Sequence, residues 1–314
     1  IRSHSNLRQE KKLIEYLDVS HDELDVPGAR AMILHRAVGA MRRDGIVCLK
    51  HAIPSGLVAE LNTKMQADLD SVQVDRTPNS WISLRPPPFD PYLSREIVYN
   101  ELAVEICLEL LGTGSTLTTY GANTSWPGQR TPQSTHRDVP DAPVGSSPPG
   151  VVINIPLTTF TTENGATQIY PGSHETSVED AQGTRQYTPK MLEEQANRRP
   201  PLQLTGVESG DLVIRDLRLW HGGMPNKTSE RRIMLALVVI DADYRGGDES
   251  GFKGFEAEQG SEAFWQDSRM NTAVCFVPAG DRSYYLLGKH SEPLTVLRKD
   301  WFARGKKPTP RSND

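Results

Sequence analysis

Apolar residues recur every three to four positions in the first third of the chain, and this spacing predicts amphipathic helices. One helix is predicted over 29–42 and ends at Gly45, because glycine readily adopts the left-handed conformation that closes a helix. Ser55 is placed to cap a second helix, and Gly112 to end a third. The apolar stripes of these helices are Met32, Ile33, Val38 and Met41; Leu57, Leu61, Met65 and Leu69; and Val98, Leu102, Ile106 and Leu110.

From about residue 115 the pattern changes to short apolar or alternating runs bounded by glycine and proline, which predicts strands. Many short strands with helices outside them are typical of a mainly β fold, so we expect a double-stranded β-helix (jelly-roll) core with flanking helices. The polar stretches 139–150 and 174–203 are predicted to be loops at its rim. The expected strands are 46–49, 115–120, 151–157, 166–170, 211–214, 217–220 and 232–240.

A proline-dense stretch runs from Pro78 to Pro91 and contains Trp81, Arg85 and Phe89. Proline at this density predicts a loop. An aromatic-rich loop could line a pocket, and a surface linker is equally compatible with the pattern.

The length of 314 residues suits a single domain over 1–314. Within it we expect a helical N-terminal part (about 1–112), the jelly-roll core (about 113–244), a C-terminal extension (about 245–302) and a flexible tail (303–314). No pattern assigns the extension a role, so it is a candidate substrate-binding or homodimer element.

Composition narrows the classes of partner. A net charge of −5 gives no reason to expect nucleic acid or an anionic membrane surface, and no apolar run approaches the ~20 residues of a membrane span. Cys48, Cys107 and Cys275 are odd in number and scattered, which predicts reduced thiols and a cytoplasmic protein.

Candidate chemistry is concentrated at His136 and Asp138, with His221 far downstream. Residues two apart in extended backbone project to the same side, so His136 and Asp138 can face one ion together. Two imidazoles and one carboxylate form the facial triad that binds Fe(II) and leaves positions open for other ligands. The same three residues could hold zinc in a hydrolase, or be buried polar groups satisfied by hydrogen bonds.

Four segments together resemble the phytanoyl-CoA dioxygenase family of Fe(II)/2-oxoglutarate-dependent oxygenases, over about residues 43–240. The most specific is Glu-Asn-Gly-Ala-Thr at 163–167, running into Tyr-Pro-Gly-Ser-His at 170–174. The others are Gln-Ser-Thr-His-Arg-Asp at 133–138, Gly-Asp-Leu-Val at 210–213, and His-Gly-Gly at 221–223 with Asn226 and two arginines at 231–232.

The resemblance implies the cofactor Fe(II), the co-substrates 2-oxoglutarate and dioxygen, and a small-molecule substrate, with natural-product biosynthesis as the expected setting. His136, Asp138 and His221 would be the iron ligands. Arg232, eleven positions after His221, would hold the distal carboxylate of 2-oxoglutarate. The further 2-oxoglutarate contacts that it implies are Gln133, Thr167 and, less directly, Tyr120.

The same resemblance implies roles for further residues and limits the possible reactions. An intact Asp138 favours hydroxylation, desaturation or a related oxidation over halogenation, since halogenating relatives carry a small residue there. His174 is expected to be structural, Trp220 to be a core residue, and Arg231 to face away from the interior. The alternatives are a zinc-dependent hydrolase, an acyl-CoA hydroxylase of the same family, and a binding protein on a decayed oxygenase fold.

Overall fold

The structure is a computed structural model of the whole chain. It describes residues 14–24, 26–71, 81–82, 84–139, 145, 147–176, 187–244, 254–280, 282, 285 and 295–297. Among these residues, no helix is long and apolar enough to cross a membrane.

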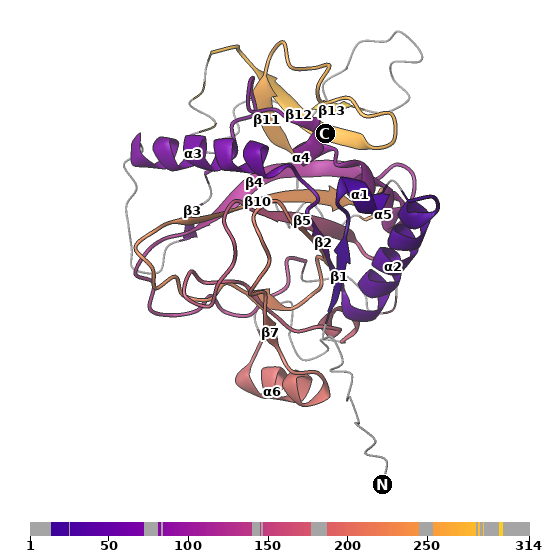
Figure 1. Cartoon of the computed structure of the whole chain (residues 1–314), viewed down its shortest axis with the longest axis vertical. Coiled ribbons are helices and arrows are strands. Elements are labelled where there is room, and N and C mark those ends of the chain that lie inside the picture. Colours follow the sequence, from indigo (N-terminus) through magenta and orange to yellow (C-terminus); the bar gives the residue numbers. More distant parts are fainter. Residues whose placement is uncertain are drawn as a thin grey trace, which may run out of the picture.

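One large sheet forms the centre of the molecule (Figure 1). Its middle is antiparallel: β10 pairs along its length with β4 on one side and β5 on the other. In spatial order the strands are β1 (Glu15–Asp18), β2 (Ile46–Lys50), β8 (Leu212–Asp216), β5 (Gly150–Pro156), β10 (Arg232–Ile240), β4 (Thr116–Ser125), β12 (Asn271–Val277) and β11 (Phe255–Glu258). In addition, β3 (Trp81–Ile82) pairs with β4, and β13 (Thr295–Leu297) pairs with β12.

A second, small sheet contains β7 (Leu202–Gln203), β6 (Gln168–Ile169) and β9 (His221–Gly222). Apolar residues from β2, β8 and β10 pack against Ile169 of this small sheet. The arrangement fits the predicted jelly roll.

The other face of the large sheet is covered by helices. Along β10, Ile233, Leu235 and Leu237 pack toward the helical side, whereas Met234 lies in the cluster on the opposite side. A strand covered on both faces is apolar at every position, which is why the sequence of β10 shows no alternation. The helices are α1 (His21–Leu24), α2 (Ala29–Asp44), α3 (Ser55–Ser71), α4 (Arg95–Val98), α5 (Glu101–Leu111), α6 (Pro189–Arg198) and the 3-10 turn η1 (Ser173–Glu175).

Several predicted boundaries were wrong. The helical stripe from Val98 to Leu110 is split into α4 and α5, because Asn100 caps α5 by accepting from the backbone N–H of Ala103. Residues 217–220, predicted to be a strand, form a turn. The predicted loop 174–203 contains α6, which Thr188 caps and whose side chains are mostly polar.

The described part of the proline-dense stretch is not a surface linker, and none of its residues lines the cavity described below. Its described part from Leu84 to Phe89 is largely buried. The Arg85 guanidinium pairs with the buried carboxylate of Glu256, and Phe89 packs edge-on against Tyr285 at 5.6 Å. The segment therefore fastens the C-terminal part of the chain to the rest.

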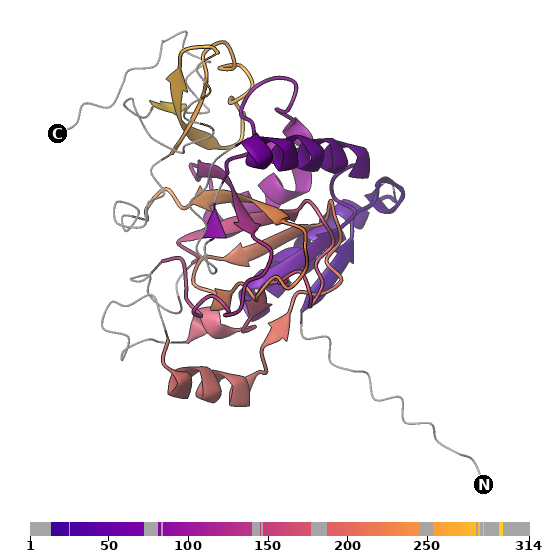
Figure 2. The ribbon, with the colours of Figure 1, turned by 90° about the vertical axis from the view of Figure 1, so that its left-hand side faces the viewer.

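The C-terminal extension continues the large sheet. Strand β12 pairs in parallel with β4, and the buried Trp265 packs against Phe255 and Tyr120. In both views these strands (yellow) lie at one end of the molecule and α6 at the opposite end (Figure 1, Figure 2). Its predicted role in a homodimer stays a prediction.

Candidate metal centre

Two distant segments are joined by backbone hydrogen bonds at the site. His136 and His221 each donate a backbone N–H to the other's carbonyl, both at 2.9 Å. The N–H of Gln133 donates to Gly223, and that of Asp138 to Leu217. The segment 133–138 is therefore extended beside 217–223, although it forms an isolated bridge instead of a regular strand.

The glycine after His221 has a steric reason. A Cβ at Gly222 would lie 2.9 Å from the carbonyl oxygen of Gln133, closer than real Cβ atoms approach. Only glycine lets the segments that carry His136 and His221 come this close.

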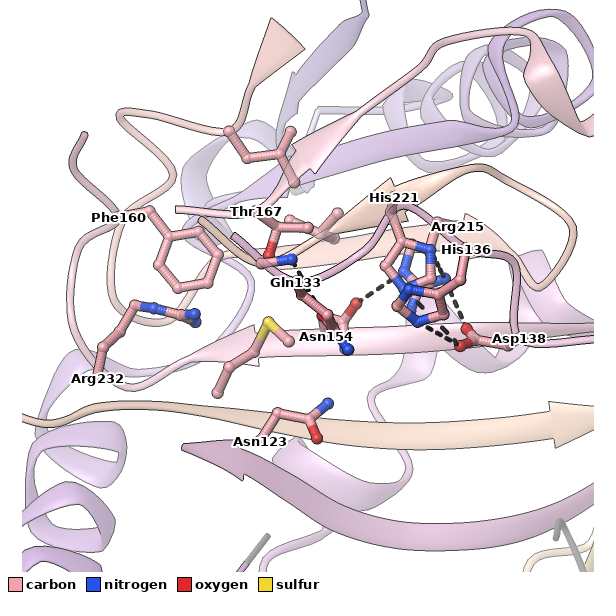
Figure 3. Close-up of a pocket in the computed structure, with 14 residues that line it drawn as sticks. Asn123, Gln133, His136, Asp138, Asn154, Phe160, Thr167, Arg215, His221 and Arg232 are labelled. Atoms are coloured by element: carbon pink, nitrogen blue, oxygen red, sulfur yellow. Dashed lines mark hydrogen bonds and ion pairs between the residues drawn. The ribbon is translucent and has the colours of Figure 1, made fainter. Parts of the chain in front are cut away.

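The side chains of His136, Asp138 and His221 converge (Figure 3). One donor atom from each lies within 4.8 Å of the others, and this is the only such group among the described residues. Oδ1 of Asp138 is 3.8 Å from Nε2 of His136 and 3.7 Å from Nε2 of His221. The three atoms can coordinate a single ion.

Both imidazoles are oriented for metal binding. Nδ1 of His136 lies 2.9 Å from the carbonyl oxygen of Ser134, and Nδ1 of His221 lies 3.0 Å from that of Leu219. With Nδ1 donating to these carbonyls, each Nε2 presents its lone pair toward Asp138.

An arginine that sequence reasoning missed lies directly behind the triad. Nη1 of Arg215 donates to Oδ2 of Asp138 at 2.8 Å, and Nε donates to Oδ1 of Asn154 at 3.2 Å. Neither Arg215 nor Asn154 belongs to a recognisable motif, and only an inward-facing strand position marks each of them.

Burial raises the pKa of Asp138, but the nearby guanidinium and imidazoles outweigh it and lower that pKa to about 2. Burial and Arg215 lower the pKa of His221 to about 3, so its imidazole is neutral and able to bind a metal.

The triad opens into a cavity of about 180 Å³. Figure 3 shows the triad at one end and Arg232 beside Phe160 at the other, with Gln133 and Thr167 between them. The lining residues are Asn123, Gln133, His136, Asp138, Asn154, Phe160, Thr167, Leu204, Val213, Arg215, His221, Gly223, Arg232 and Met234.

Arg232 is a buried cation without a carboxylate partner among the described residues. It is 2% exposed, its Nε donates to the carbonyl oxygen of Asn164, and its guanidinium lies 4.8 Å from the ring centre of Phe160. Nη1 is buried and makes no hydrogen bond. Burial lowers the pKa of Arg232 to about 10. An anion in the cavity would satisfy this group.

The other predicted 2-oxoglutarate contacts divide into two groups. Gln133, whose Oε1 accepts from the backbone N–H of Gly223, and Thr167 both line the cavity. Tyr120 does not: it lies on the opposite face of β4 from Asn123, in the core beside Trp265. Because side chains alternate along a strand, positions 120 and 123 cannot share a face, and the expectation for Tyr120 was wrong.

Three further positions lie outside the cavity lining. Arg231 pairs with Asp70 on α3. His174 is buried against Gly45, where a Cβ would lie 2.6 Å from its Nδ1, so it has a packing role. Trp220 is 1% exposed and stacks on Tyr187 at 3.8 Å.

The chain is similar to known dioxygenases in sequence. Residues 93–234 match the family model of phytanoyl-CoA dioxygenase (PhyH). The Dioxygenase aneA of Aspergillus aculeatus is 28% identical over 231 residues, which cover 67% of this chain and 73% of that protein. The Multifunctional dioxygenase prhA of Penicillium brasilianum is 27% identical over 230 residues, which cover 66% of this chain and 72% of that protein.

Solved structures agree on the fold. The epimerase SnoN, solved in complex with Fe3+, alpha ketoglutarate and nogalamycin RO, has a TM-score of 0.53 at 19% identity, covering 68% of this chain and 85% of its own. The alpha ketoglutarate dependent carbocyclase SnoK from nogalamycin biosynthesis has a TM-score of 0.51 at 20% identity, and the match covers 66% of this chain and 84% of that protein. Together these matches confirm the predicted resemblance to the phytanoyl-CoA dioxygenase family, whose model residues 93–234 match, and the chain is an oxidoreductase of the dioxygenase class.

Proposed function

We propose that this dioxygenase holds Fe(II) with His136, Asp138 and His221, binds 2-oxoglutarate with Arg232, and oxidises a C–H bond of a small organic molecule. The triad is a donor set typical of non-haem Fe(II) oxygenases. His136 and His221 offer their Nε2 atoms and Asp138 its Oδ1 atom, as the distances above require.

The observation that carries the proposal is the buried Arg232 in the same cavity as the triad. A guanidinium with an unbonded buried Nη1 fits one carboxylate of a dicarboxylic acid, because the guanidinium fork matches a carboxylate geometrically. The triad end would then receive the other end of the same molecule. A zinc hydrolase would leave this arginine without a role.

The remaining lining residues position the co-substrate and exclude water. Gln133 and Thr167 present polar groups between the two ends of the cavity, and Phe160, Leu204 and Met234 surround it with apolar surface. When bound, iron, 2-oxoglutarate and dioxygen supply the oxidising chemistry, with succinate and CO2 as co-products. The protein's contribution is to fix the geometry of these groups and keep them dry.

The substrate class is the further part of the proposal. The sequence relatives are named as dioxygenases, SnoK is a carbocyclase from nogalamycin biosynthesis, and SnoN was solved in complex with nogalamycin RO. These similarities support a natural-product scaffold as substrate, with hydroxylation, desaturation or a related oxidation as the outcome.

The test is anaerobic binding followed by turnover. The purified chain should bind Mn(II) or Fe(II), and the metal-loaded protein should then bind 2-oxoglutarate. His136→Ala should lose the metal, and Arg232→Ala should keep it but lose 2-oxoglutarate.

A screen of natural-product scaffolds should then release succinate with iron. Activity with zinc and not with iron would contradict the proposal and favour a hydrolase. Succinate release with acyl-CoA thioesters alone would instead support the acyl-CoA alternative.

A further inference from the structure

Arg215 is a buried charged residue at the triad for which the proposed function has no use. It is 6% exposed and lines the cavity. Its Nη1 donates to Asp138, and it lies 3.4 Å from Nδ1 of His221, which already faces the carbonyl oxygen of Leu219.

The alternation of β8 places Arg215 there. Leu212 and Ile214 pack toward the helices, whereas Val213 and Arg215 face the cavity. Asn154 lies opposite Val213 on the neighbouring strand β5, diagonal to Arg215. The two polar side chains are therefore neighbours on one face of the sheet.

The two carboxylate oxygens of Asp138 have different surroundings. Oδ1 is near both imidazole Nε2 atoms, at 3.8 and 3.7 Å. Oδ2 accepts from Nη1 of Arg215 at 2.8 Å. Oδ1 is therefore available to a metal at the triad, whereas Oδ2 is bound by the guanidinium.

A carboxylate can bind a metal through one oxygen or through both. A facial triad offers open positions for a two-point ligand and dioxygen only if its carboxylate takes a single position. Rotation of Asp138 into two-oxygen binding would occupy a position that a co-substrate needs.

We propose that Arg215 is a positioning residue: it retains Oδ2 of Asp138, so that the metal receives Oδ1 alone and its other positions stay open. The inference rests on the proposed function, since it assumes a metal at the triad. Asn154 holds the guanidinium in place by accepting from its Nε at 3.2 Å, and its own Nδ2 donates to the carbonyl of Leu235 at 3.4 Å. A lysine at position 215 would supply the charge without these two simultaneous contacts.

The direct test is a crystal structure of the wild-type chain with Mn(II). The expected result is a bond from Oδ1 of Asp138 to the ion, with Oδ2 still on Arg215. Coordination through both oxygens, or through Oδ2, would overturn the inference.

Binding measurements separate orientation from charge. Calorimetric titration with Mn(II) should give a dissociation constant about 10- to 100-fold higher in Arg215→Met and in Arg215→Lys, as for other partners that orient metal ligands. Asn154→Ala should give an intermediate loss. If the guanidinium acted only through its charge, Arg215→Met would bind the dication more tightly and Arg215→Lys would be unchanged, and either result overturns the inference.

Visible absorption provides a second readout, and a variant outside the cavity provides the control. The visible absorption that 2-oxoglutarate adds to the anaerobic Fe(II) protein should weaken in Arg215→Lys, because fewer positions are open. Arg95→Met removes an arginine paired with Asp267 at 2.7 Å outside the cavity and should leave both readouts unchanged. If Arg215→Met fails to fold, the lysine and Asn154 variants decide the outcome.

The failure of this inference can be told from failure of the proposed function. A wild-type chain that binds neither Mn(II) nor Fe(II) would overturn both. A wild-type chain that binds metal and 2-oxoglutarate, with folded Arg215 variants that bind them equally well, would overturn only the role of Arg215.

Discussion

Replacing Arg232 by methionine is expected to stabilise the ligand-free protein and at the same time to remove most of its affinity for 2-oxoglutarate. The two effects have one cause. The guanidinium is buried without a carboxylate partner among the described residues, so it is unfavourable in the empty cavity and favourable only when an anion is bound. Methionine has a similar length and no charge to desolvate.

The size of the expected stabilisation follows from the pKa of Arg232. Burial lowers the pKa of Arg232 from 12.5 to about 10. At ~1.4 kcal/mol per pKa unit, the folded state is destabilised by about 3 kcal/mol. Below pH 10 the folded and unfolded chains both carry the proton, so this destabilisation is fully present at pH 7 and declines only as pH rises from about 10 toward 12.5.

Part of this gain in the free energy of unfolding is lost, because methionine cannot make the contacts of the guanidinium. The hydrogen bond to the carbonyl oxygen of Asn164 and the stacking on Phe160 are each worth about 1 kcal/mol. The variant should therefore be more stable than the wild type by about 1 kcal/mol. For 2-oxoglutarate, loss of a buried charge partner costs about 3 kcal/mol, which is about a hundredfold in the dissociation constant.

The assays are urea unfolding of the metal-free protein and calorimetric titration of 2-oxoglutarate into the Mn(II) protein. Arg231→Met is the matched control, because Arg231 pairs with Asp70 on the outer side of the sheet. It should leave the affinity unchanged and should not stabilise the chain. An Arg232→Met protein that is less stable than the wild type and binds 2-oxoglutarate normally would refute the reasoning. A loss of affinity in the Arg231 variant would move the co-substrate site to that residue.

Further outcomes are expected elsewhere in the chain. His136→Ala and His221→Ala should each abolish metal binding in calorimetry while the circular dichroism spectrum stays native, because the apolar core does not include the imidazoles. Gly222→Ala should destabilise the fold by roughly 1–3 kcal/mol in urea unfolding, since its Cβ would collide with a backbone carbonyl, whereas Gly39→Ala, with open space in a helix, should stabilise it slightly. Deleting 245–314 should give an aggregating protein in size-exclusion chromatography, because β12 pairs with β4; a stable monomer would show instead that the core is an independent domain.

Spacing along the chain predicted much of the site. The pair His136 and Asp138 could be recognised because residues two apart in extended backbone share a side, and the structure brings both to His221. Alternation places the adjacent Arg231 and Arg232 on opposite faces, and the family resemblance assigned Arg232 to the interior; in the structure Arg231 pairs with Asp70 and Arg232 lines the cavity. The same rule, applied to Tyr120, would have removed it from the site, had the inward-facing positions of β4 been known.

Other features could not be predicted because they depend on contacts between distant segments. Helix α6 has few apolar residues to form a stripe, so its sequence resembled a loop. Asn154 and Arg215 belong to strands whose pairing is absent from any local pattern, and only that pairing makes them neighbours behind Asp138.

The sequence by itself determined the helices with apolar stripes and the central strands, because these depend on residue type and short-range spacing. Its motifs also carried the resemblance to the dioxygenase family and marked His136, Asp138 and His221 as candidate metal ligands. Tertiary structure decided which face of each strand is inside, how the C-terminal strands join the sheet, and which cation reaches which carboxylate oxygen. A strand buried on both faces carries no alternation, so its inward positions are defined only by the elements that pack on it. For that reason only the family resemblance could assign Arg232 to the interior, and the contact of Arg215 with Oδ2 of Asp138 required the folded sheet.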